Sequence, residues 1–270
     1  MTERVTGLAE HYHGPREFDR VINFGKIFEP MRNFVVPLEE RAKENLPGLE
    51  FLGFEISRIR EIYDKITRIA NSMTPENSGA RFEYQRQLAH FFSFLGPETQ
   101  GKFIAIKRAG SLVARFYPHV EVYEVEGKRL PMENGDLALG LIGSLPLEDF
   151  EKERIIIGEG CVATGITIAG ILKTIAENEV RPKIIEVHAL AVSQLGGEFL
   201  LDYARGLNLG LAIKGGMPVY AMNEVFYLMR TVEERYPQGT YAVGDAGDWS
   251  EPLLPWYDNR AWWNRGRITS

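Results

Sequence analysis

The sequence predicts an α/β protein in which helices flank a mostly parallel sheet and a helical extension precedes it. Over residues 96–248, short apolar runs alternate with helical stretches, which is typical of parallel sheets. Residues 1–95 instead show apolar positions at helical spacing, and residues 249–270 form a tail that contains all four tryptophans. We therefore divide the chain at these boundaries into a helical N-terminal extension, an α/β core and a C-terminal tail.

Two helices are expected in the N-terminal extension. In FEISRIREIYDKITRIA (Phe54–Ala70), apolar side chains recur at three- and four-residue steps and build one stripe. The stripe consists of Ile56, Ile59, Ile62, Tyr63, Ile66 and Ile69. The boundary TPENSG separates it from a second helix, ARFEYQRQLAHFFSFLG, which stops at Gly96-Pro97. Two roles stay open for these helices, a hood over a site or a dimer surface.

Six strands are expected in the core. They are Phe103–Lys107, Val120–Glu126, Arg154–Glu159, Lys183–Val192, Leu209–Ile213 and Pro218–Met222. Between the third and the fourth, TIAGILKTIAENEV has the spacing of an amphipathic helix. Ligands of such sheets bind at the carboxyl ends of the strands, and the glycine-rich stretch after Arg154–Glu159 lies at one of these ends.

Composition and charge exclude several classes of function. The 270 residues carry a net charge of −6 and their Lys and Arg are scattered, so no nucleic-acid footprint is expected. The single cysteine, Cys161, excludes an intrachain disulfide and suits a reducing cytosol. The first residues lack an apolar signal core, and no apolar run is long enough to span a bilayer. We expect a cytoplasmic protein without membrane or nucleic-acid partners.

The stretch RIIIGEGCVATGITIAG concentrates the features of an anion site. Gly158, Gly160 and Gly165 allow tight turns and close approach of the backbone to a ligand, because no Cβ intervenes. Thr164 and Thr167 add hydroxyl donors, and the following helix directs unpaired N–H groups and its positive dipole end to the same point. Neither G-x-x-x-x-G-K-[ST] nor G-x-G-x-x-G is present. The pattern predicts a nest for a phosphate-sized anion; the alternative is a strand-to-helix turn that binds nothing.

This stretch resembles the loop with which type I phosphoribosyltransferases bind 5-phosphoribosyl 1-pyrophosphate (PRPP). In that family, backbone amides and hydroxyls of the loop hold the 5′-phosphate, while an acidic residue before it binds the ribose hydroxyls. The resemblance implies the fold of that family and a ribose contact by Glu159, with Ala163 to Thr167 around the phosphate. The PRPP-binding residues that it implies here are Glu159, Gly160, Cys161, Val162, Ala163, Thr164, Gly165, Ile166 and Thr167.

Two further segments resemble uracil phosphoribosyltransferases within this family. FIAIKRAGSLVARF is similar to their strand–RAG–helix segment, in which the arginine contacts pyrophosphate; here it is Arg108. VGDAGDW is similar to their GDAGD signature, which lines the uracil site and contributes an aspartate near PRPP. The resemblance implies acceptor contacts by Gly244, Asp245 and Ala246, and a PRPP contact by Asp245. The three segments stand in the family's order.

Four positions depart from the family pattern. Glu159 replaces the usual Asp, and Ile166 stands where the family's loop has a second glycine. The family's mobile loop corresponds to VEGKRLPMENGDLALG, in which Arg129, with Lys128 beside it, is the counterpart of the arginine that closes over pyrophosphate. Gly239 falls at the uracil-reading position. This last departure bears on uracil as the acceptor more than on PRPP.

The resemblance implies that a nitrogen acceptor displaces pyrophosphate from C1 of PRPP through an oxocarbenium-like transition state. Arg108, with Arg129 or Lys128 and a Mg²⁺ ion, would serve the leaving group. Glu159 and Asp245 would contact the ribose and the metal end. The catalytic residues implied are Arg108, Asp245 and Glu159, and the acceptor-binding residues are Gly239, Gly244, Asp245 and Ala246.

Two functions stay open on these grounds. The first is transfer of 5-phosphoribosyl to uracil or another nitrogen acceptor, including an unusual acceptor in a specialised biosynthetic pathway. The second is a non-catalytic regulator that binds PRPP or a nucleotide. The altered mobile loop favours the regulator, whereas the retained Arg108, Glu159 and Asp245 favour the enzyme. Members of the resembled family form dimers or larger assemblies, so a homodimer is expected.

Other residues with reactive side chains have plainer interpretations. His188 lies in an apolar run and is interpreted as a core histidine, and His11 with His13 alone makes a poor metal site. Cys161 has no His or Lys near it in sequence, so we interpret it as a packing residue and not as a nucleophile. The tail tryptophans are interpreted as packing residues.

Overall fold

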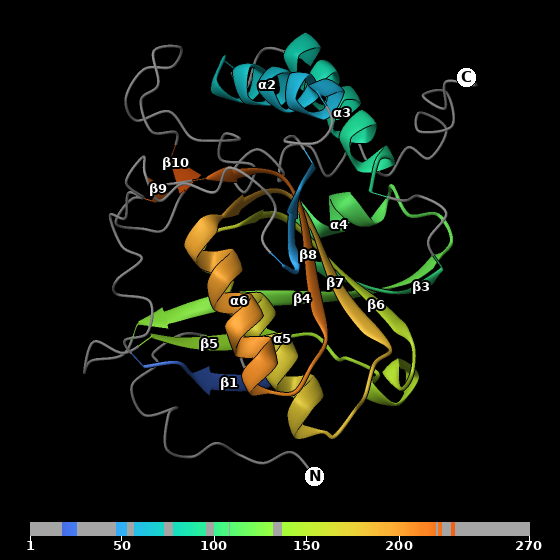
Figure 1. Ribbon diagram of the computed structural model, residues 1–270, viewed down its shortest axis with the longest axis vertical. Coiled ribbons are helices and arrows are strands. Elements are labelled where there is room, and N and C mark those ends of the chain that lie inside the picture. The colour runs from blue at the N-terminus through green and yellow to red at the C-terminus, as the bar shows by residue number, and fades with distance from the viewer. Residues whose placement is uncertain are drawn as a thin grey trace.

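The computed structural model describes residues 18–25, 47–52, 57–72, 78–95, 100–107, 109–131, 137–219, 221–222 and 228–229. Eight strands of this part form one sheet in the order β1-β5-β4-β3-β6-β7-β8-β2 (Figure 1). They are β1 (Arg20–Asn23), β2 (Leu49–Phe51), β3 (Gly101–Ile106), β4 (Val120–Pro131), β5 (Leu137–Ile142), β6 (Arg154–Val162), β7 (Ile184–Ser193) and β8 (Leu211–Val219). β4, β3, β6, β7, β8 and β2 run parallel, and β5 is antiparallel to both β4 and β1. The mostly parallel sheet predicted from the sequence is confirmed.

The strand order reverses next to β6, and this reversal positions the site. From β3 the chain crosses through α4 (Ala109–Ala114) to β4 on one side, and then returns to place β6 on the other side of β3. Phe103 of β3 pairs in register with Val122 of β4 and with Ile156 of β6. In open α/β sheets, ligands bind outside the carboxyl ends of the strands at such a point. The segment that follows β6 lies there.

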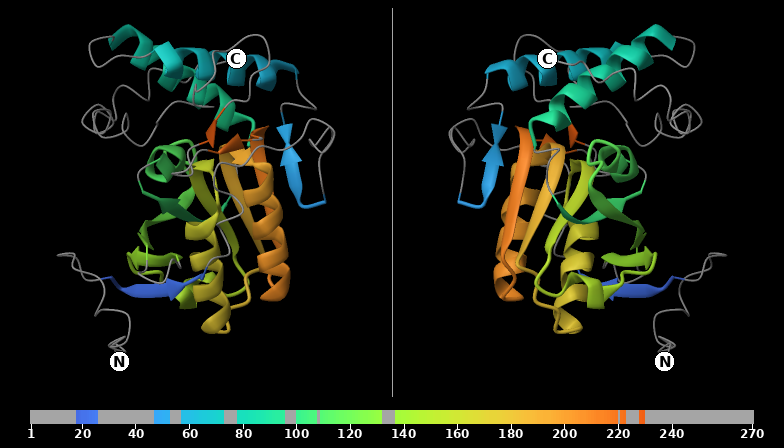
Figure 2. Two further views of the ribbon diagram at one scale, coloured as in Figure 1. Left: turned by 90° about the vertical axis from the view of Figure 1, so that its left-hand side faces the viewer. Right: turned by 90° about the vertical axis from the view of Figure 1, so that its right-hand side faces the viewer.

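Two long helices cover the sheet from one side. α5 (Ile166–Glu177) and α6 (Gln194–Gly206) lie next to each other, α5 against β5 and α6 against β7, β8 and β2 (Figures 1 and 2). α5 connects β6 to β7, and α6 connects β7 to β8, so the chain forms two successive crossover units here. The amphipathic helix predicted from TIAGILKTIAENEV is α5.

The helices predicted in the N-terminal extension are α2 (Ser57–Ser72) and α3 (Ser78–Ser93). They pack against each other beyond the carboxyl ends of β7 and β8 (Figure 2). The predicted stripe is buried at Ile59, Ile62, Tyr63 and Ile66. Phe91 of α3 reaches Gly216 of β8, where an added Cβ would lie 2.6 Å from its ring.

Two differences from the predicted elements have physical causes. Residues 1–95 also supply β1 and β2, which pair at opposite edges of the sheet, and strands of four and three residues are too short to show a period of two. The last three residues of the run predicted as Leu209–Ile213 and the first two residues of the run predicted as Pro218–Met222 are joined in one continuous strand, β8, while β9 (Ala221–Met222) is a separate short strand. Gly216 lies within this strand where the backbone comes close to β7, since an added Cβ would lie 2.5 Å from the Leu190 carbonyl oxygen.

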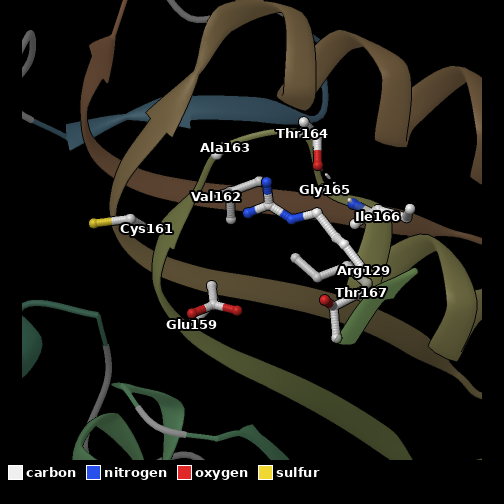
Figure 3. A pocket seen from close by; sticks show the side chains of 10 residues that line it. Arg129, Glu159, Cys161, Val162, Ala163, Thr164, Gly165, Ile166 and Thr167 are labelled. Carbon is white, nitrogen blue, oxygen red and sulfur yellow. Dashed lines mark hydrogen bonds between the residues drawn. The ribbon is translucent and has the colours of Figure 1, made fainter. Parts of the chain in front are cut away.

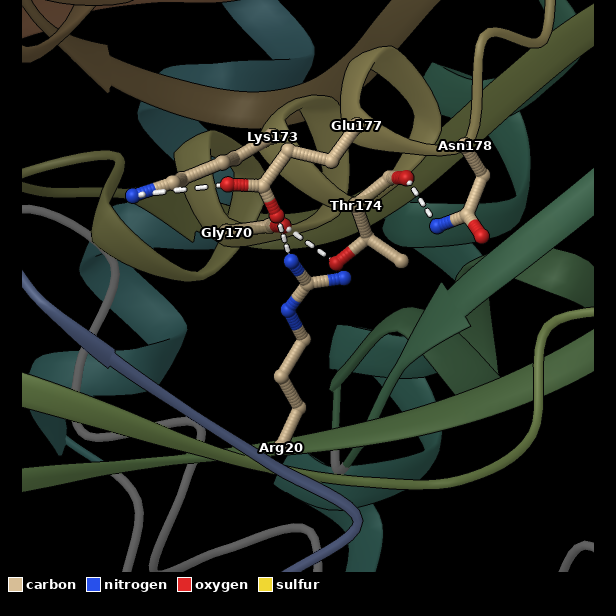
Figure 4. A network of polar contacts seen from close by, with 6 residues as sticks. All are labelled: Arg20, Gly170, Lys173, Thr174, Glu177 and Asn178. Atoms are coloured by element: carbon tan, nitrogen blue, oxygen red, sulfur yellow. Dashed lines mark hydrogen bonds and ion pairs between the residues drawn. The ribbon is translucent and has the colours of Figure 1, made fainter. Parts of the chain in front are cut away.

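Strand β1 is attached to the carboxyl-terminal end of α5 by side chains (Figure 4). Arg20 forms an ion pair with Glu177, which also faces Lys173 at 3.8 Å. One turn earlier, Thr174 Oγ1 donates to the Gly170 carbonyl oxygen at 2.8 Å. These pairs are partly exposed, so each contributes little by itself.

A polar cluster lies within the core, below the carboxyl ends of the strands. His188 is fully buried, and its Nδ1 lies 2.5 Å from the Tyr117 hydroxyl. Burial lowers the pKa of His188 to about 4, so its ring is neutral at pH 7. Burial raises the pKa of Glu186, but hydrogen bonds from Lys214 and Arg154 outweigh it and leave that pKa lowered. The interpretation of His188 as a core histidine is confirmed.

Candidate phosphate-binding site

The loop after β6 leads into α5, which begins without a side-chain cap. Gly165 is the N-cap residue, with a left-handed φ of 75°, and no side chain accepts a hydrogen bond there as a cap. The Ile166 N–H has only a long contact of 3.4 Å with Thr164 Oγ1. Because N–H groups of a first helical turn lack intrahelical acceptors and carry the positive end of the dipole, this helix start is suited to bind an anion.

A pocket in front of this loop has about 340 Å³ of empty space, part of it open to solvent (Figure 3). It is lined by Arg129, Glu159, Cys161, Val162, Ala163, Thr164, Gly165, Ile166, Thr167 and Ile168. The Arg129 side chain lies over the loop, with the Glu159 carboxyl group and the Thr167 hydroxyl group around it (Figure 3). One cation, one carboxyl group and a helix N-terminus therefore share one pocket.

Arg129 reaches the pocket from the hairpin of β4 and β5. Gly127 of β4 lies against Thr167 at the start of α5, and an added Cβ would be 2.6 Å from the Thr167 hydroxyl oxygen. Successive side chains of a strand point to opposite faces, so Arg129 and Lys128 diverge. Arg129 lines the pocket and Lys128 does not. Of the two cations that the sequence offered as counterparts of the mobile-loop arginine, the structure thus brings Arg129 to the loop.

Glu159 has an environment that favours its neutral form. Its carboxyl oxygen accepts the Gly160 N–H at 3.0 Å, and the side chain is partly exposed. Burial raises the pKa of Glu159 to about 8, although hydrogen bonds from the Gly160 and Cys161 amides and the charge of Arg129 act in the opposite direction. In the free protein, burial therefore favours the neutral form of this carboxyl group over its usual ionised form.

The start of α4, at Ala109 and Gly110, packs against the GEG segment of β6 through glycines. An added Cβ on Gly110, in α4, would lie 2.2 Å from the Gly158 carbonyl oxygen. A Cβ on Gly160 would lie 2.6 Å from the Cβ of Ala109. Only residues without a Cβ allow the start of α4 to approach β6 so closely. Two segments that the sequence singled out independently thus meet at the same edge of the sheet.

The remaining predicted site residues divide into two groups. Eight of the nine residues predicted in the PRPP loop line the pocket, and Gly160 is the exception. The side chain of Ile166 is buried in the core, and half-buried Cys161 packs against that core. The residues outside the described part of the chain include Arg108, Gly239, Gly244, Asp245 and Ala246. Residues 132–136 of the predicted mobile loop, His11, His13 and the four tryptophans also lie outside it.

Sequence reasoning missed the support behind the loop. Ser193, at the end of β7, donates from Oγ to the Ala163 carbonyl oxygen at 2.5 Å and accepts the Gly196 N–H at 2.8 Å. Serine is one of the residues preferred at a helix N-cap. That signal could have located the helix start but not its contact with the loop, because the contact joins segments thirty residues apart.

The described residues contain no group of three or more His, Cys, Asp or Glu that could hold a metal ion. Glu159 is the one carboxyl group among the residues that line the pocket. A Mg²⁺ ion commonly takes one or two carboxylates together with substrate phosphates and water. These side chains thus fit an ion that arrives with a phosphorylated substrate. Among the described helices, none combines the length and apolar character that crossing a membrane requires.

No protein-family model matches the sequence, and no curated protein matches it. Solved structures are similar to this chain at low sequence identity. The AQ2163 protein from Aquifex aeolicus has a TM-score of 0.51 at 15% identity, covering 73% of this chain and 95% of that chain. Orotate phosphoribosyltransferase from Mycobacterium tuberculosis H37Rv, in complex with PRPP, has a TM-score of 0.39 at 10% identity, covering 63% and 95%. Purine phosphoribosyltransferase from Pyrococcus horikoshii Ot3 has 0.36 at 13%, covering 56% and 95%.

The structural neighbours therefore include phosphoribosyltransferases, at low identity. Likeness at these identities concerns the fold alone, and the two TM-scores below 0.5 support no conclusion about the reaction. The finer resemblance to uracil phosphoribosyltransferases stays a prediction. What this chain does must be inferred from its own pocket.

Proposed function

We propose that this chain binds PRPP in the pocket after β6 and transfers its 5-phosphoribosyl group to a nitrogen acceptor, with release of pyrophosphate. One observation carries the proposal. The uncapped start of α5, the Glu159 carboxyl group and the Arg129 guanidinium line a single pocket at the reversal of the strand order (Figure 3). A phosphorylated ribose that carries a second phosphorylated arm has partners for each of these three groups.

The 5′-phosphate is assigned to the loop from Ala163 to Thr167. Gly165 places the first amides of α5 at the pocket, and Thr164 and Thr167 line it beside them. Backbone N–H groups at a helix start bind phosphate through hydrogen bonds and through the helix dipole. The loop alone supports phosphate binding in general; the assignments of the ribose and the pyrophosphate depend on the side chains of Glu159 and Arg129.

The ribose hydroxyls are assigned to Glu159. A carboxylate accepts hydrogen bonds from two vicinal hydroxyls, and a neutral carboxyl group accepts from one and donates to another. Because the pKa of Glu159 is raised to about 8, diol binding that requires the carboxylate strengthens as the pH rises through this value. The longer side chain of Glu, compared with the Asp of the resembled family, changes the position of this contact.

The pyrophosphate is assigned to the side of Arg129. Loss of the C1–O bond leaves negative charge on the departing pyrophosphate, and a fixed guanidinium stabilises it without reorganisation of water. The loop and Glu159 would hold C1 in line between this group and the acceptor nitrogen. When bound with the substrate, Mg²⁺ supplies further neutralisation of the pyrophosphate oxygens. Arg108 and Asp245, proposed from the resemblance as further contacts, lie outside the described residues.

The acceptor is proposed to be uracil-like or another nitrogen base. The residues proposed to hold it are Gly239, Gly244, Asp245 and Ala246, which lie outside the described residues. Gly239 departs from the uracil-reading sequence of the resembled family. For this reason the acceptor panel in any assay must include bases other than uracil.

The test is incubation of the full chain with PRPP, Mg²⁺ and a panel of nitrogen bases, followed by phosphorus NMR. We expect the PRPP signals to be replaced by those of free pyrophosphate and a new nucleoside monophosphate with one acceptor. Binding of PRPP and of ribose 5-phosphate is measured in parallel by calorimetry. If the chain binds neither PRPP nor ribose 5-phosphate, the proposal is wrong.

A second function is favoured by the state of Glu159. A neutral carboxyl group binds a ribose but stabilises positive charge that develops at C1 less well than a carboxylate. A regulator that binds PRPP or a nucleotide needs only the first of these properties. Binding of PRPP with no pyrophosphate release on any acceptor, at pH 7 or at pH 9, would favour the regulator.

A further inference from the structure

The first turn of α6 packs against the loop that we assign to phosphate. Ser193 Oγ donates to the Ala163 carbonyl oxygen at 2.5 Å, and Ser193 is 3% exposed. Ser193 Oγ also accepts the Gly196 N–H at 2.8 Å, which caps α6. One buried hydroxyl group therefore joins the start of α6 to the loop.

Two further contacts come from the same face of α6. A Cβ on Gly196 would lie 2.0 Å from the Ala163 carbonyl oxygen, so the helix backbone itself touches the loop. A Cβ on Gly165 would lie 2.6 Å from Leu200 Cγ. Residues 193, 196 and 200 follow helical spacing and lie on one side of α6. Since Ser193, Gly196 and Leu200 do not line the pocket, this face supports the loop from outside it.

The Ser193 hydrogen bond fixes the orientation of a peptide group in the loop. In a trans peptide, the carbonyl and the N–H of the next residue point in opposite directions. The Ala163 carbonyl is directed to Ser193, so the Thr164 N–H is directed away from α6. Rotation of this peptide would instead turn a carbonyl oxygen toward the pocket that Ala163 and Thr164 line, where it would repel an anion.

We infer that Ser193 is a positioning residue for the phosphate site: its hydroxyl group holds the Ala163–Thr164 peptide in the anion-binding orientation. The inference rests on the proposed function, because it assigns the loop to a phosphate. It assigns Ser193 no contact with substrate. Because Ser193 Oγ forms both hydrogen bonds, we expect removal of the hydroxyl group to loosen the loop and to weaken phosphate binding at the same time.

The test compares Ser193→Ala with Ser193→Thr, which keeps the hydroxyl group, and with Thr174→Val as a matched control. Thr174→Val also removes a side-chain hydrogen bond to a carbonyl, at the far end of α5. Amide hydrogen exchange of residues 164–167 is measured in the free protein, and the Kd for ribose 5-phosphate is measured by calorimetry. We expect Ser193→Ala to accelerate loop exchange and to raise Kd, each by about tenfold, the factor for one net hydrogen bond. In Ser193→Thr and in Thr174→Val, we expect loop exchange and Kd to stay near their wild-type values.

The inference is wrong if Ser193→Ala leaves loop exchange and Kd as they are in Thr174→Val. It is also wrong if Kd rises while exchange at residues 164–167 does not. If the wild-type chain does not bind ribose 5-phosphate, the proposed function fails, and the exchange measurement alone still decides whether Ser193 holds the loop. Should Ser193→Ala not fold, Ser193→Cys, with its weaker donor and acceptor, is expected to give a smaller change of the same sign in both measurements.

Discussion

The two ends of α5 are built in opposite ways. At its carboxyl-terminal end, side chains satisfy the backbone and join neighbouring elements, through Thr174, Asn178 and the Arg20–Glu177 ion pair (Figure 4). At its amino-terminal end, Gly165 provides no side chain to cap the helix, and the pocket opens in front of it (Figure 3). Donors that a side chain has satisfied cannot bind a ligand. The contrast indicates which end of the helix the fold stabilises and which end it keeps for binding.

The largest expected effect is that of Gly165→Ala at the amino-terminal end. Alanine is strained at the left-handed φ of this position, and its Cβ would clash with the Leu200 side chain. Together these two effects lower the unfolding free energy by about 2 to 4 kcal/mol. We expect ribose 5-phosphate affinity to fall about a hundredfold as the helix start shifts, more than loss of one hydrogen bond would cause. Gly206→Ala is the control, because a Cβ there meets nothing within 4 Å. Denaturant unfolding and calorimetry measure the two effects; equal behaviour of the variants would contradict the role of Gly165.

The next effect concerns charge in the pocket. Arg129→Ala is expected to lower the rate of pyrophosphate release about a hundredfold, since loss of one good transition-state contact costs about 3 kcal/mol. Lys128→Ala, adjacent in the strand but outside the pocket, is expected to keep a rate near that of the wild type. Steady-state rates from phosphorus NMR give the comparison. A similar loss in both variants would mean that general positive charge, not the position of Arg129, matters.

A smaller effect is the pH dependence of stability that the raised pKa of Glu159 causes. Its pKa is raised from 4.5 to about 8, so the unfolded chain ionises at lower pH than the folded protein, and this group's stabilising contribution falls as the pH rises between these values. Glu159→Gln lacks this loss. A full pKa shift would correspond to about 1.4 kcal/mol for each pKa unit. Because the side chain is partly exposed, we expect a smaller effect: between pH 4.5 and pH 8, the unfolding free energy of the variant rises by about 2 kcal/mol relative to that of the wild type. Urea unfolding across this range measures it; a constant difference would exclude a raised pKa.

The smallest effect is at the other end of the helix. Glu179, just after α5, has a φ of 59°, a conformation that glycine adopts without strain. Glu179→Gly is expected to raise the unfolding free energy by about 1 kcal/mol and to leave ribose 5-phosphate affinity unchanged. Thermal unfolding with calorimetry checks both. A change in affinity would show that the two ends of α5 are coupled.

The sequence predicts the parts of the site that are local in the chain. The loop residues from Glu159 to Thr167 are consecutive, and glycine positions with hydroxyl residues before an apolar helix already indicate a phosphate-sized nest. The main strands and α2, α3 and α5 carry periods long enough to detect. For the same reason the burial of Ile166 could be anticipated, since it begins a helix whose apolar face meets the sheet.

Contacts between distant segments could not be predicted in this way. The choice of Arg129 over Lys128 depends on which face of β4 meets the pocket, and β4 runs five residues beyond the strand expected from its apolar run. Strand β5 and helix α6 were not predicted, and with α6 the support from Ser193 was missed. The raised pKa of Glu159 likewise comes from burial by tertiary packing, which no spacing of residues reports.

The pairing of β1 and β2 has a consequence for the order of folding. Both strands precede the rest of the sheet in sequence, yet Leu49 pairs with Ile213 and Arg20 pairs with Leu141, each far along the chain. During synthesis, β1 lacks its partner until β5 has left the ribosome, and β2 lacks its partner until β8 has. Among β3 to β8, every pair except β3–β6 instead joins strands that are consecutive in the sequence. Non-local closures of this kind slow folding. We therefore expect the two outer strands to dock last, onto a sheet whose central strands and phosphate loop have already formed.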